Sequence, residues 1–374
     1  MHEKPANLSS VVMPVRMMPQ DANPAGFVHG GIILKHIDLA GAMVAMRHCR
    51  SAVVTVSIDR MDFLAVCNVG EAVTFTSSVN FAGRTSMEVG VRVEAEDLLT
   101  GSVRHAGSAY LTYVAVDSQG RPTPVPALRL ESPAERRRFA EARLRREARL
   151  SERAFERSSQ AAPGPEDAPS PTVGSDAPAS PAGTRTASEL DGPDASDAPD
   201  GPGRTVAESG VVMPVRMMPQ DANPAGNVHG GVILKHIDLA GAMAAMRHCR
   251  SQVVTASIDR MEFLGAAHVG EMMTFKALVN RAGGCTMEAG IRVETEDLLT
   301  GAVRHVGSAY LTFTALDARR EPVAVPRLLL SSALELRRNA EALRRQDTRS
   351  VERGRERANQ GQGFACPREA PHAS

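Results

Sequence analysis

The sequence of 374 residues contains no tryptophan and only three tyrosines, and aromatic residues make up 3% of it. Any core must therefore be built from aliphatic and methionine side chains. Lysine is nearly absent too, so arginine carries almost all of the basic charge. The 43 basic residues balance 43 acidic ones, so bulk charge gives no reason to expect a nucleic-acid partner.

Cysteine is also sparse. The five cysteines are widely spaced and form no CxxC pair, which argues against a disulfide framework and against a structural zinc site. His29, His36, His48 and Cys49 match no known ligand spacing, so we expect no metal site.

Long apolar runs are missing as well. No stretch of 18 apolar residues occurs, so we expect no membrane insertion. Residues 1–10 lack the apolar segment of a secretory signal. The sequence therefore predicts a cytoplasmic protein with reduced thiols.

The dominant feature of the sequence is an internal repeat with an offset of 200 residues. Residues 11–26 recur unchanged at 211–226, and 76 of the 100 positions from 11 to 110 are identical in the second copy. Such a period is too long for a solenoid. It indicates a tandem duplication of one domain.

The segments around the two copies differ sharply in composition. Each copy precedes an Arg/Glu-rich stretch that predicts a charged helix, lying on its own domain or docking a partner as a coiled coil. A Pro/Ala/Ser/Gly-rich linker joins the copies and is too poor in large apolar residues to order itself. The expected parts are an N-terminal tail (1–10), the first domain (11–130), a charged helix (131–160), a disordered linker (161–208), the second domain (209–330), a charged helix (331–360) and a C-terminal tail (361–374).

Each copy reads as a strand, a helix and then four strands. Residues 11–18 have strand composition, and Pro14 suits an edge strand. Residues 32–49 are apolar on nearly every side, which is typical of a buried helix. The following strand-like runs are joined by short turns, which favours an antiparallel sheet. We therefore predict an α+β unit, a helix wrapped by a sheet, with the two copies paired edge to edge into a continuous sheet.

At two segments the sequence resembles a known family. DANPAGFVHGGIILKHIDLAGAMVAMRHC and VVTVSIDRMDFL resemble the acyl-CoA thioesterases of the hotdog superfamily. The likeness is to the acyl-CoA hydrolase branch, which includes two-domain cytosolic (brain-type) enzymes and single-domain bacterial relatives. It covers about 100 residues of each copy. It implies tandem hotdog domains that hydrolyse fatty acyl-CoA to free fatty acid and CoA, without a dissociable cofactor.

Three features of the motif could carry that chemistry. Gly30–Gly31 and Gly230–Gly231 open the buried helices, where unsatisfied N–H groups could stabilise a developing oxyanion. Asp38 and Asp238 lie within an otherwise apolar helix, where a carboxylate is costly unless it is bonded. The resemblance implies that this aspartate is a general base for water, and direct attack through a mixed anhydride is the other option.

Asn23 and Asn223 lie in the loop before each helix. An asparagine there is commonly a turn or cap residue. The resemblance instead implies that it positions water or thioester, with Asn23 working beside Asp238 and Asn223 beside Asp38. Since all four residues are present, we predict two competent sites in each chain.

The copies diverge where coenzyme A could bind. Arg84, Thr85 and Ser86 of the first copy are a plausible anchor for CoA phosphates, since guanidinium pairs well with phosphate. Gly284 and Cys285 in the second copy cannot supply that anchor, so the two CoA sites are expected to differ in affinity. The other interpretation is that Arg84 is an exposed hairpin residue.

Two other functions remain open at the level of sequence. A non-catalytic acyl-CoA-binding or sensing module would use the same fold, and a hotdog hydratase would act on enoyl-CoA, although its Asp/His motif is not found. Relatives build rings of six hotdog units. A homo-oligomer of three chains is therefore expected, with a lone chain as the alternative.

Overall fold

A computed structural model describes residues 3–160 and 203–357 of the chain. Most of the expected linker, residues 161–202, and the tail 361–374 lie outside the described residues. The last part of the expected linker is structured, because β9 (Arg204–Thr205) and α3 (Val206–Ser209) precede the second domain. The ordered second half therefore begins several residues before the boundary expected at 209.

The first copy follows the predicted order of strand, helix and four longer strands. Its elements are β1 (Lys4–Pro5), η1 (Asn7–Ser9), β2 (Val11–Arg16), η2 (Pro19–Asp21), α1 (Gly30–Cys49), β3 (Ala52–Ile58), β4 (Met61–Asp62), β5 (Ala72–Ala82), β6 (Ser86–Glu96), β7 (Val103–Val116), β8 (Leu128–Arg129) and α2 (Pro133–Gln160).

The second copy repeats this order nearly residue for residue. After β9 and α3 it contains β10 (Val211–Arg216), η3 (Pro219–Asp221), α4 (Gly230–Cys249), β11 (Gln252–Ile258), β12 (Met261–Glu262), β13 (Met272–Gly283), β14 (Thr286–Glu296), β15 (Val303–Leu316), β16 (Leu328–Leu329) and α5 (Ala333–Arg357).

Each copy is the predicted α+β unit, in which a sheet wraps one long helix. Leu34 and Ile37 of α1 are fully buried, as the all-round apolar pattern requires. The sheet strands alternate: Met87 and Val89 of β6 are fully buried toward the helix, whereas Arg92 on the other face is exposed. The predicted fold class is confirmed.

The two sheets are joined by an exchange of short strands. The orders are β12-β3-β7-β6-β5-β2 and β10-β13-β14-β15-β11-β4, so each six-stranded sheet takes one strand from the other copy. Met61 of β4 pairs with Ile258, and Met261 of β12 pairs with Ile58. The copies therefore pair edge to edge, as predicted, but only through these short segments, so that two six-stranded sheets result instead of one continuous sheet. It commits each copy to the other through backbone hydrogen bonds.

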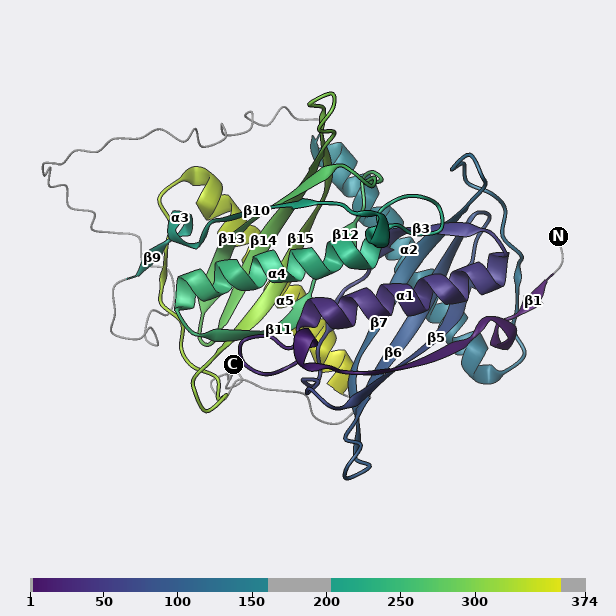
Figure 1. Ribbon diagram of the computed structural model, residues 1–374, viewed down its shortest axis with the longest axis horizontal. Coiled ribbons are helices and arrows are strands. Elements are labelled where there is room, and N and C mark those ends of the chain that lie inside the picture. Colours follow the sequence, from purple (N-terminus) through teal and green to yellow (C-terminus); the bar gives the residue numbers. More distant parts are fainter. Residues whose placement is uncertain (1–2, 161–202, 358–374) are drawn as a thin grey trace, which may run out of the picture.

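The helices α1 and α4 lie side by side at the centre of the molecule (Figure 1), and the first turns of each approach the other. A Cβ added at Gly31 would lie 2.7 Å from the Lys235 carbonyl oxygen and 3.1 Å from the Asp238 Cβ. A Cβ added at Gly231 would lie equally close to Lys35 and Asp38. Glycine is therefore required here because the two backbones come too close for any side chain.

Gly31→Ala should lower the free energy of unfolding by about 1–3 kcal/mol, because the new methyl group meets backbone atoms that cannot rotate away. The clash outweighs the gain in helix propensity of about 1 kcal/mol. Urea denaturation measures the change, and Gly265→Ala is the control. At exposed Gly265 the nearest atom to an added Cβ is Arg304 Nη1 at 3.8 Å. Equal stability of the two variants would contradict this close helix contact.

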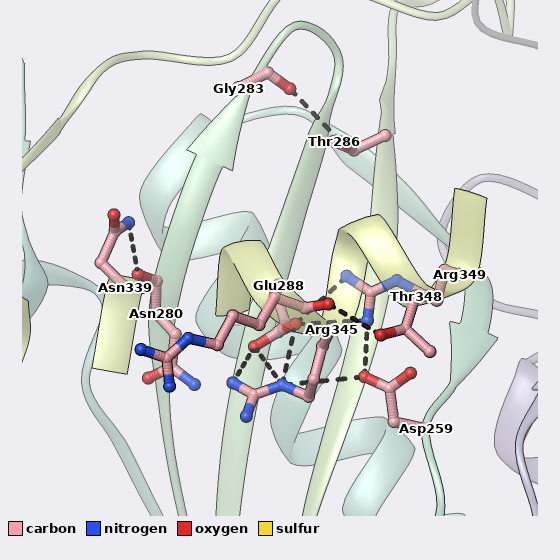
Figure 2. Close-up of polar contacts among 10 residues, drawn as sticks. Asp259, Asn280, Gly283, Thr286, Glu288, Asn339, Arg345, Thr348 and Arg349 are labelled. Carbon is pink, nitrogen blue, oxygen red and sulfur yellow. Dashed lines mark hydrogen bonds and ion pairs between the residues drawn. The ribbon is translucent and has the colours of Figure 1, made fainter. Parts of the chain in front are cut away.

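The charged helices α2 and α5 lie on the outer faces of the sheets, each on its own copy, as one of the two interpretations predicts. In α5, Arg345 Nη2 lies 2.7 Å from Glu288 and Arg349 Nη1 lies 2.5 Å from Asp259 (Figure 2). Glu288 and Arg349 are 3% and 5% exposed, so this ion network is buried. Burial raises the pKa of Asp259 to about 6, against the opposing charge of Arg349.

Two further findings concern the thiols and the membrane. Among the described residues, Cys49, Cys67 and Cys249 are free thiols. None of the helices within residues 3–160 and 203–357 is long and apolar enough to cross a membrane.

Candidate functional site

Asp38 and Asp238 are both fully buried, and each carboxylate reaches the first turn of the helix from the other copy. The Gly31 N–H donates to Asp238 Oδ2 at 2.6 Å, and the Gly231 N–H donates to Asp38 Oδ2 at 2.5 Å. The positive end of each helix dipole therefore faces a carboxylate, which stabilises the ionised form. Two composite sites result, here named the Asp38 site and the Asp238 site.

A histidine from the same loop completes each contact. His29 Nδ1 lies 2.6 Å from Asp238 Oδ2, and His229 Nδ1 lies 2.7 Å from Asp38 Oδ2. Burial of the imidazole opposes its charge, but the adjacent carboxylate outweighs burial and raises the pKa of His29 and of His229. Each imidazole therefore donates a hydrogen bond to the carboxylate of the other copy, so each site contains residues from both copies.

The other carboxylate oxygen is bonded from within the same copy. Thr55 Oγ1 donates to Asp38 Oδ1 at 2.8 Å, and Thr255 Oγ1 donates to Asp238 Oδ1 at 2.6 Å. In the first copy the Tyr113 hydroxyl also donates to Asp38 Oδ1, at 2.9 Å. Phe313 occupies the corresponding place in the second copy, so that donor is missing from the Asp238 site.

These contacts set the protonation of the Asp38 site. Burial alone would raise the pKa of Asp38, but the hydrogen bond and charge of His229, with the Thr55 and Tyr113 hydroxyls, lower it below the ordinary value. Burial and the adjacent carboxylate hold the pKa of Tyr113 well above its usual value. Asp38 is therefore an anion at neutral pH, and Tyr113 remains a donor.

Asn23 and Asn223 use their carboxamide oxygens within their own loops. Asn23 Oδ1 accepts from the Phe27 N–H at 3.1 Å, and Asn223 Oδ1 accepts from the Asn227 N–H at 3.1 Å. This loop leads directly to the helix start that contacts the aspartate of the other copy. The structure therefore joins the Asn23 loop to the Asp238 site, and the role of each carboxamide in positioning water stays a prediction.

The two glycines of each Gly-Gly pair make different contacts. The N–H groups of Gly31 and Gly231 bond the aspartates, so neither is open to a substrate carbonyl in this arrangement. Gly30 and Gly230 lie against the same carboxylates, since an added Cβ would lie 3.2 Å from Asp238 Oδ1 and 3.1 Å from Asp38 Oδ2. Their N–H groups, which no described contact uses, are the better candidates for an oxyanion.

The loops that lead to the two sites also differ. Phe27 of the first copy packs on Val254 and Leu316 of the second copy, and the Arg320 guanidinium stacks 4.7 Å from its ring centre. Arg320 takes a left-handed φ of 65°, where Gly120 takes 74° in the first copy. The other copy has Asn227 and Gly120 at these positions, so among the described residues this aromatic–arginine contact occurs only in the loop that leads to the Asp238 site.

Arg84, Thr85 and Ser86 lie where β5 turns into β6. Arg84 is exposed, its carbonyl accepts from the Val125 N–H, and the Thr85 carbonyl accepts from the Ala115 N–H. No described contact joins these residues to either aspartate. Their contribution to CoA binding stays a prediction.

From the sequence alone, no role is predicted for His29, Thr55 or Tyr113. A histidine stands directly before the Gly-Gly pair in both copies, His29 and His229. Thr55 lies inside the VVT run of the motif, so both residue types were visible in the sequence. The one signal for Tyr113 is its replacement by Phe313 between otherwise similar strands. Their convergence on one carboxylate could not be read from spacing, because half of each site comes from the other copy.

Comparison with known proteins identifies the family of both copies. The family model described as the thioesterase superfamily matches residues 25–102 and 225–302. The chain is 28% identical over 335 residues to the cytosolic acyl coenzyme A thioester hydrolase of Mus musculus, across 86% of this chain and 78% of the relative. It is 42% identical over 118 residues to the uncharacterized acyl-CoA thioester hydrolase YkhA of Bacillus subtilis, across 32% of this chain and 69% of the relative.

Among solved structures, an apo-hexameric acyl-CoA thioesterase is 40% identical, over 41% of this chain and 99% of that one, with a TM-score of 0.40. The family model falls once in each copy, over the loop, the central helix and the strands that build the two composite sites. The chain therefore belongs to the thioesterase superfamily and carries two of its hotdog domains.

Proposed function

We propose that this protein hydrolyses acyl-CoA thioesters to CoA and a free carboxylic acid, with fatty acyl-CoA as the substrate class. The observation that carries the proposal is the fully buried carboxylate held at the start of the opposite helix, at Asp38 and at Asp238. A buried, oriented carboxylate beside helix N–H groups suits the activation of water next to a carbonyl. The names of the related thioester hydrolases support the same reaction class.

In this mechanism the carboxylate takes a proton from water as the water oxygen bonds to the thioester carbon. The resulting oxyanion is stabilised at the helix start, where the Gly30 or Gly230 N–H is the candidate donor. The C–S bond then breaks, and the thiolate of CoA receives the proton. The loop asparagine, Asn23 or Asn223, orients the water or the thioester through its amide nitrogen.

The contacts favour a general base over a nucleophile. Oδ2 of Asp238 is bonded to the Gly31 N–H and lies 2.6 Å from His29 Nδ1, so attack through that atom would break both contacts. Proton transfer through Oδ1, which accepts from Thr255, leaves the carboxylate in place. Each turnover then ends with the site unchanged.

We further propose that Arg84, Thr85 and Ser86 contact the phosphates of the CoA bound at the first copy. The reaction needs no dissociable cofactor or metal in this scheme. We also propose that three chains assemble and work in the cytoplasm, since the mouse relative is named a cytosolic enzyme.

The test measures free thiol released from acyl-CoAs of short to long chain by the purified full-length chain, with mass spectrometry of the products. We expect equal amounts of CoA and carboxylic acid. Tight binding of acyl-CoA without thiol release would replace the proposal with a binding or sensing module. Addition of water to enoyl-CoA without thiol release would identify a hydratase.

A further inference from the structure

The two composite sites offer different numbers of hydrogen-bond donors to otherwise matched carboxylates. Asp38 accepts from the Gly231 N–H, His229, Thr55 and Tyr113. Asp238 has the Gly31 N–H, His29 and Thr255. A carboxylate has about four acceptor positions. Asp38 is therefore saturated by the protein, while Asp238 keeps about one position open.

Tyr113 is built into its place. The side chain is fully buried, and its one hydroxyl proton is shared between the Asp38 backbone carbonyl and the carboxylate Oδ1, which both lie 2.9 Å from the hydroxyl oxygen. A Cβ at Gly41 would collide with that hydroxyl, so glycine makes room for it. Phe313 holds the same register opposite Met287 that Tyr113 holds opposite Met87, and Gly241 faces its ring. A hydroxyl is thus the principal difference around the two carboxylates.

The charges facing the two carboxylates are otherwise alike. His229 faces Asp38 and His29 faces Asp238, at distances that differ by 0.1 Å. Lys35 acts on His229 as Lys235 acts on His29, in each case disfavouring the imidazolium. No other charged side chain of the described residues contacts either carboxylate. A difference in how the two carboxylates are bonded and protonated can therefore be assigned to the tyrosine, while Phe27 and Arg320 distinguish the loop beside the Asp238 site.

We propose that Tyr113 is a positioning residue that occupies the last acceptor position of Asp38, so that the Asp238 site carries most of the turnover. The inference rests on the proposed thioester hydrolysis. Water can bond to the open position of Asp238, whereas at Asp38 it must first displace a protein donor. Tyr113 also stabilises the ionised carboxylate, which makes Asp38 the weaker base.

The kinetic test isolates each site and exchanges the hydroxyl. The Asp238→Asn protein should release thiol about tenfold more slowly than the Asp38→Asn protein, a ratio expected for one hydrogen bond to a charged group. In the Asp238→Asn background, Tyr113→Phe should raise kcat about tenfold. In the Asp38→Asn background, Phe313→Tyr should lower it. KM should change little, because both rings are fully buried.

The pH profile separates this role from a merely structural one. Activity falls as the carboxylate is protonated, so removing the donor should move the acid limb of the Asp38 site to higher pH. Adding a hydroxyl donor through Phe313→Tyr should move the acid limb of the pH–activity profile of the Asp238 site to lower pH. Equal activity of the two single-site proteins, or acid limbs that do not move, would overturn the proposal.

A readout without turnover keeps the two proposals distinguishable. In protein labelled with carbon-13 at the aspartate carboxyl, the Asp38 signal is identified by its loss in Asp38→Asn. Tyr113→Phe should raise the pKa of that carboxyl. A shifted titration without any thiol release would refute the proposed hydrolysis but not the stabilisation of ionised Asp38 by the Tyr113 hydroxyl. An unshifted titration would refute that stabilisation.

Discussion

The double variant Asp38→Asn/Asp238→Asn should release thiol from acyl-CoA at least about 10³-fold more slowly than the unaltered chain, because general-base catalysis contributes on this scale. Asparagine keeps the size of the side chain and a carbonyl oxygen that can accept from the Gly31 or Gly231 N–H. It cannot take a proton from water. Thiol release at saturating substrate measures the loss, and each single variant should retain the activity of the other site.

The matched control is Asp97→Asn/Asp297→Asn, the same chemical change at the exposed tips of the β6–β7 and β14–β15 hairpins. There the aspartate caps the backbone N–H groups of its own turn, and asparagine can do the same. This control should keep full activity, and both double variants should show unchanged circular dichroism. Persistent turnover in a folded Asp38→Asn/Asp238→Asn protein would refute aspartate chemistry.

Periodicity and composition predict the architecture of each copy well. The apolar pattern of 32–49 and the alternation of Met87, Val89 and Val91 depend only on which face is buried, and burial is a local property of the sequence. The same reasoning singles out Asp38, since an aspartate stands out in an apolar helix. Three of the predicted site features, the aspartate, the loop asparagine and the Gly-Gly start, are thus visible in one copy.

Apart from the pairing of Asn23 with Asp238 and of Asn223 with Asp38, which the family resemblance implies, the sequence could not predict what each copy receives from the other. The contact of Gly31 with Asp238 joins residues 207 positions apart, and β4 is only two residues long, too short to show a strand pattern. The charged helices are a second example. Arginines lie on several faces of α5, so the sequence does not tell which of them, here Arg345 and Arg349, point inward onto Glu288. In each case the missing information is a long-range contact of charged or backbone groups.

Glu288→Gln should lower the free energy of unfolding by about 3–5 kcal/mol, because it removes the main counter-ion of the partly buried Arg345 and one of the two counter-ions of the buried Arg349. Glu288 lies 2.7 Å from Arg345 and 3.2 Å from Arg349, whose other partner is Asp259 (Figure 2). With the glutamate neutral, one carboxylate must balance two guanidinium groups that water reaches poorly. Urea denaturation measures the loss, and limited proteolysis should show α5 released first.

The control lies six residues further along the same strand. Glu294 pairs with Lys276 and Arg292, whose side chains are 42% and 46% exposed, so Glu294→Gln should cost less than about 1 kcal/mol. Glu88→Gln tests the first copy, where Arg145 and Arg149 make the same contacts from α2. If Glu288→Gln were no more harmful than Glu294→Gln, solvent would already screen the network, and α5 would be held by its apolar contacts instead. A large loss confined to Glu288 and Glu88 would instead show that charge pairing is what fixes these helices on the sheets.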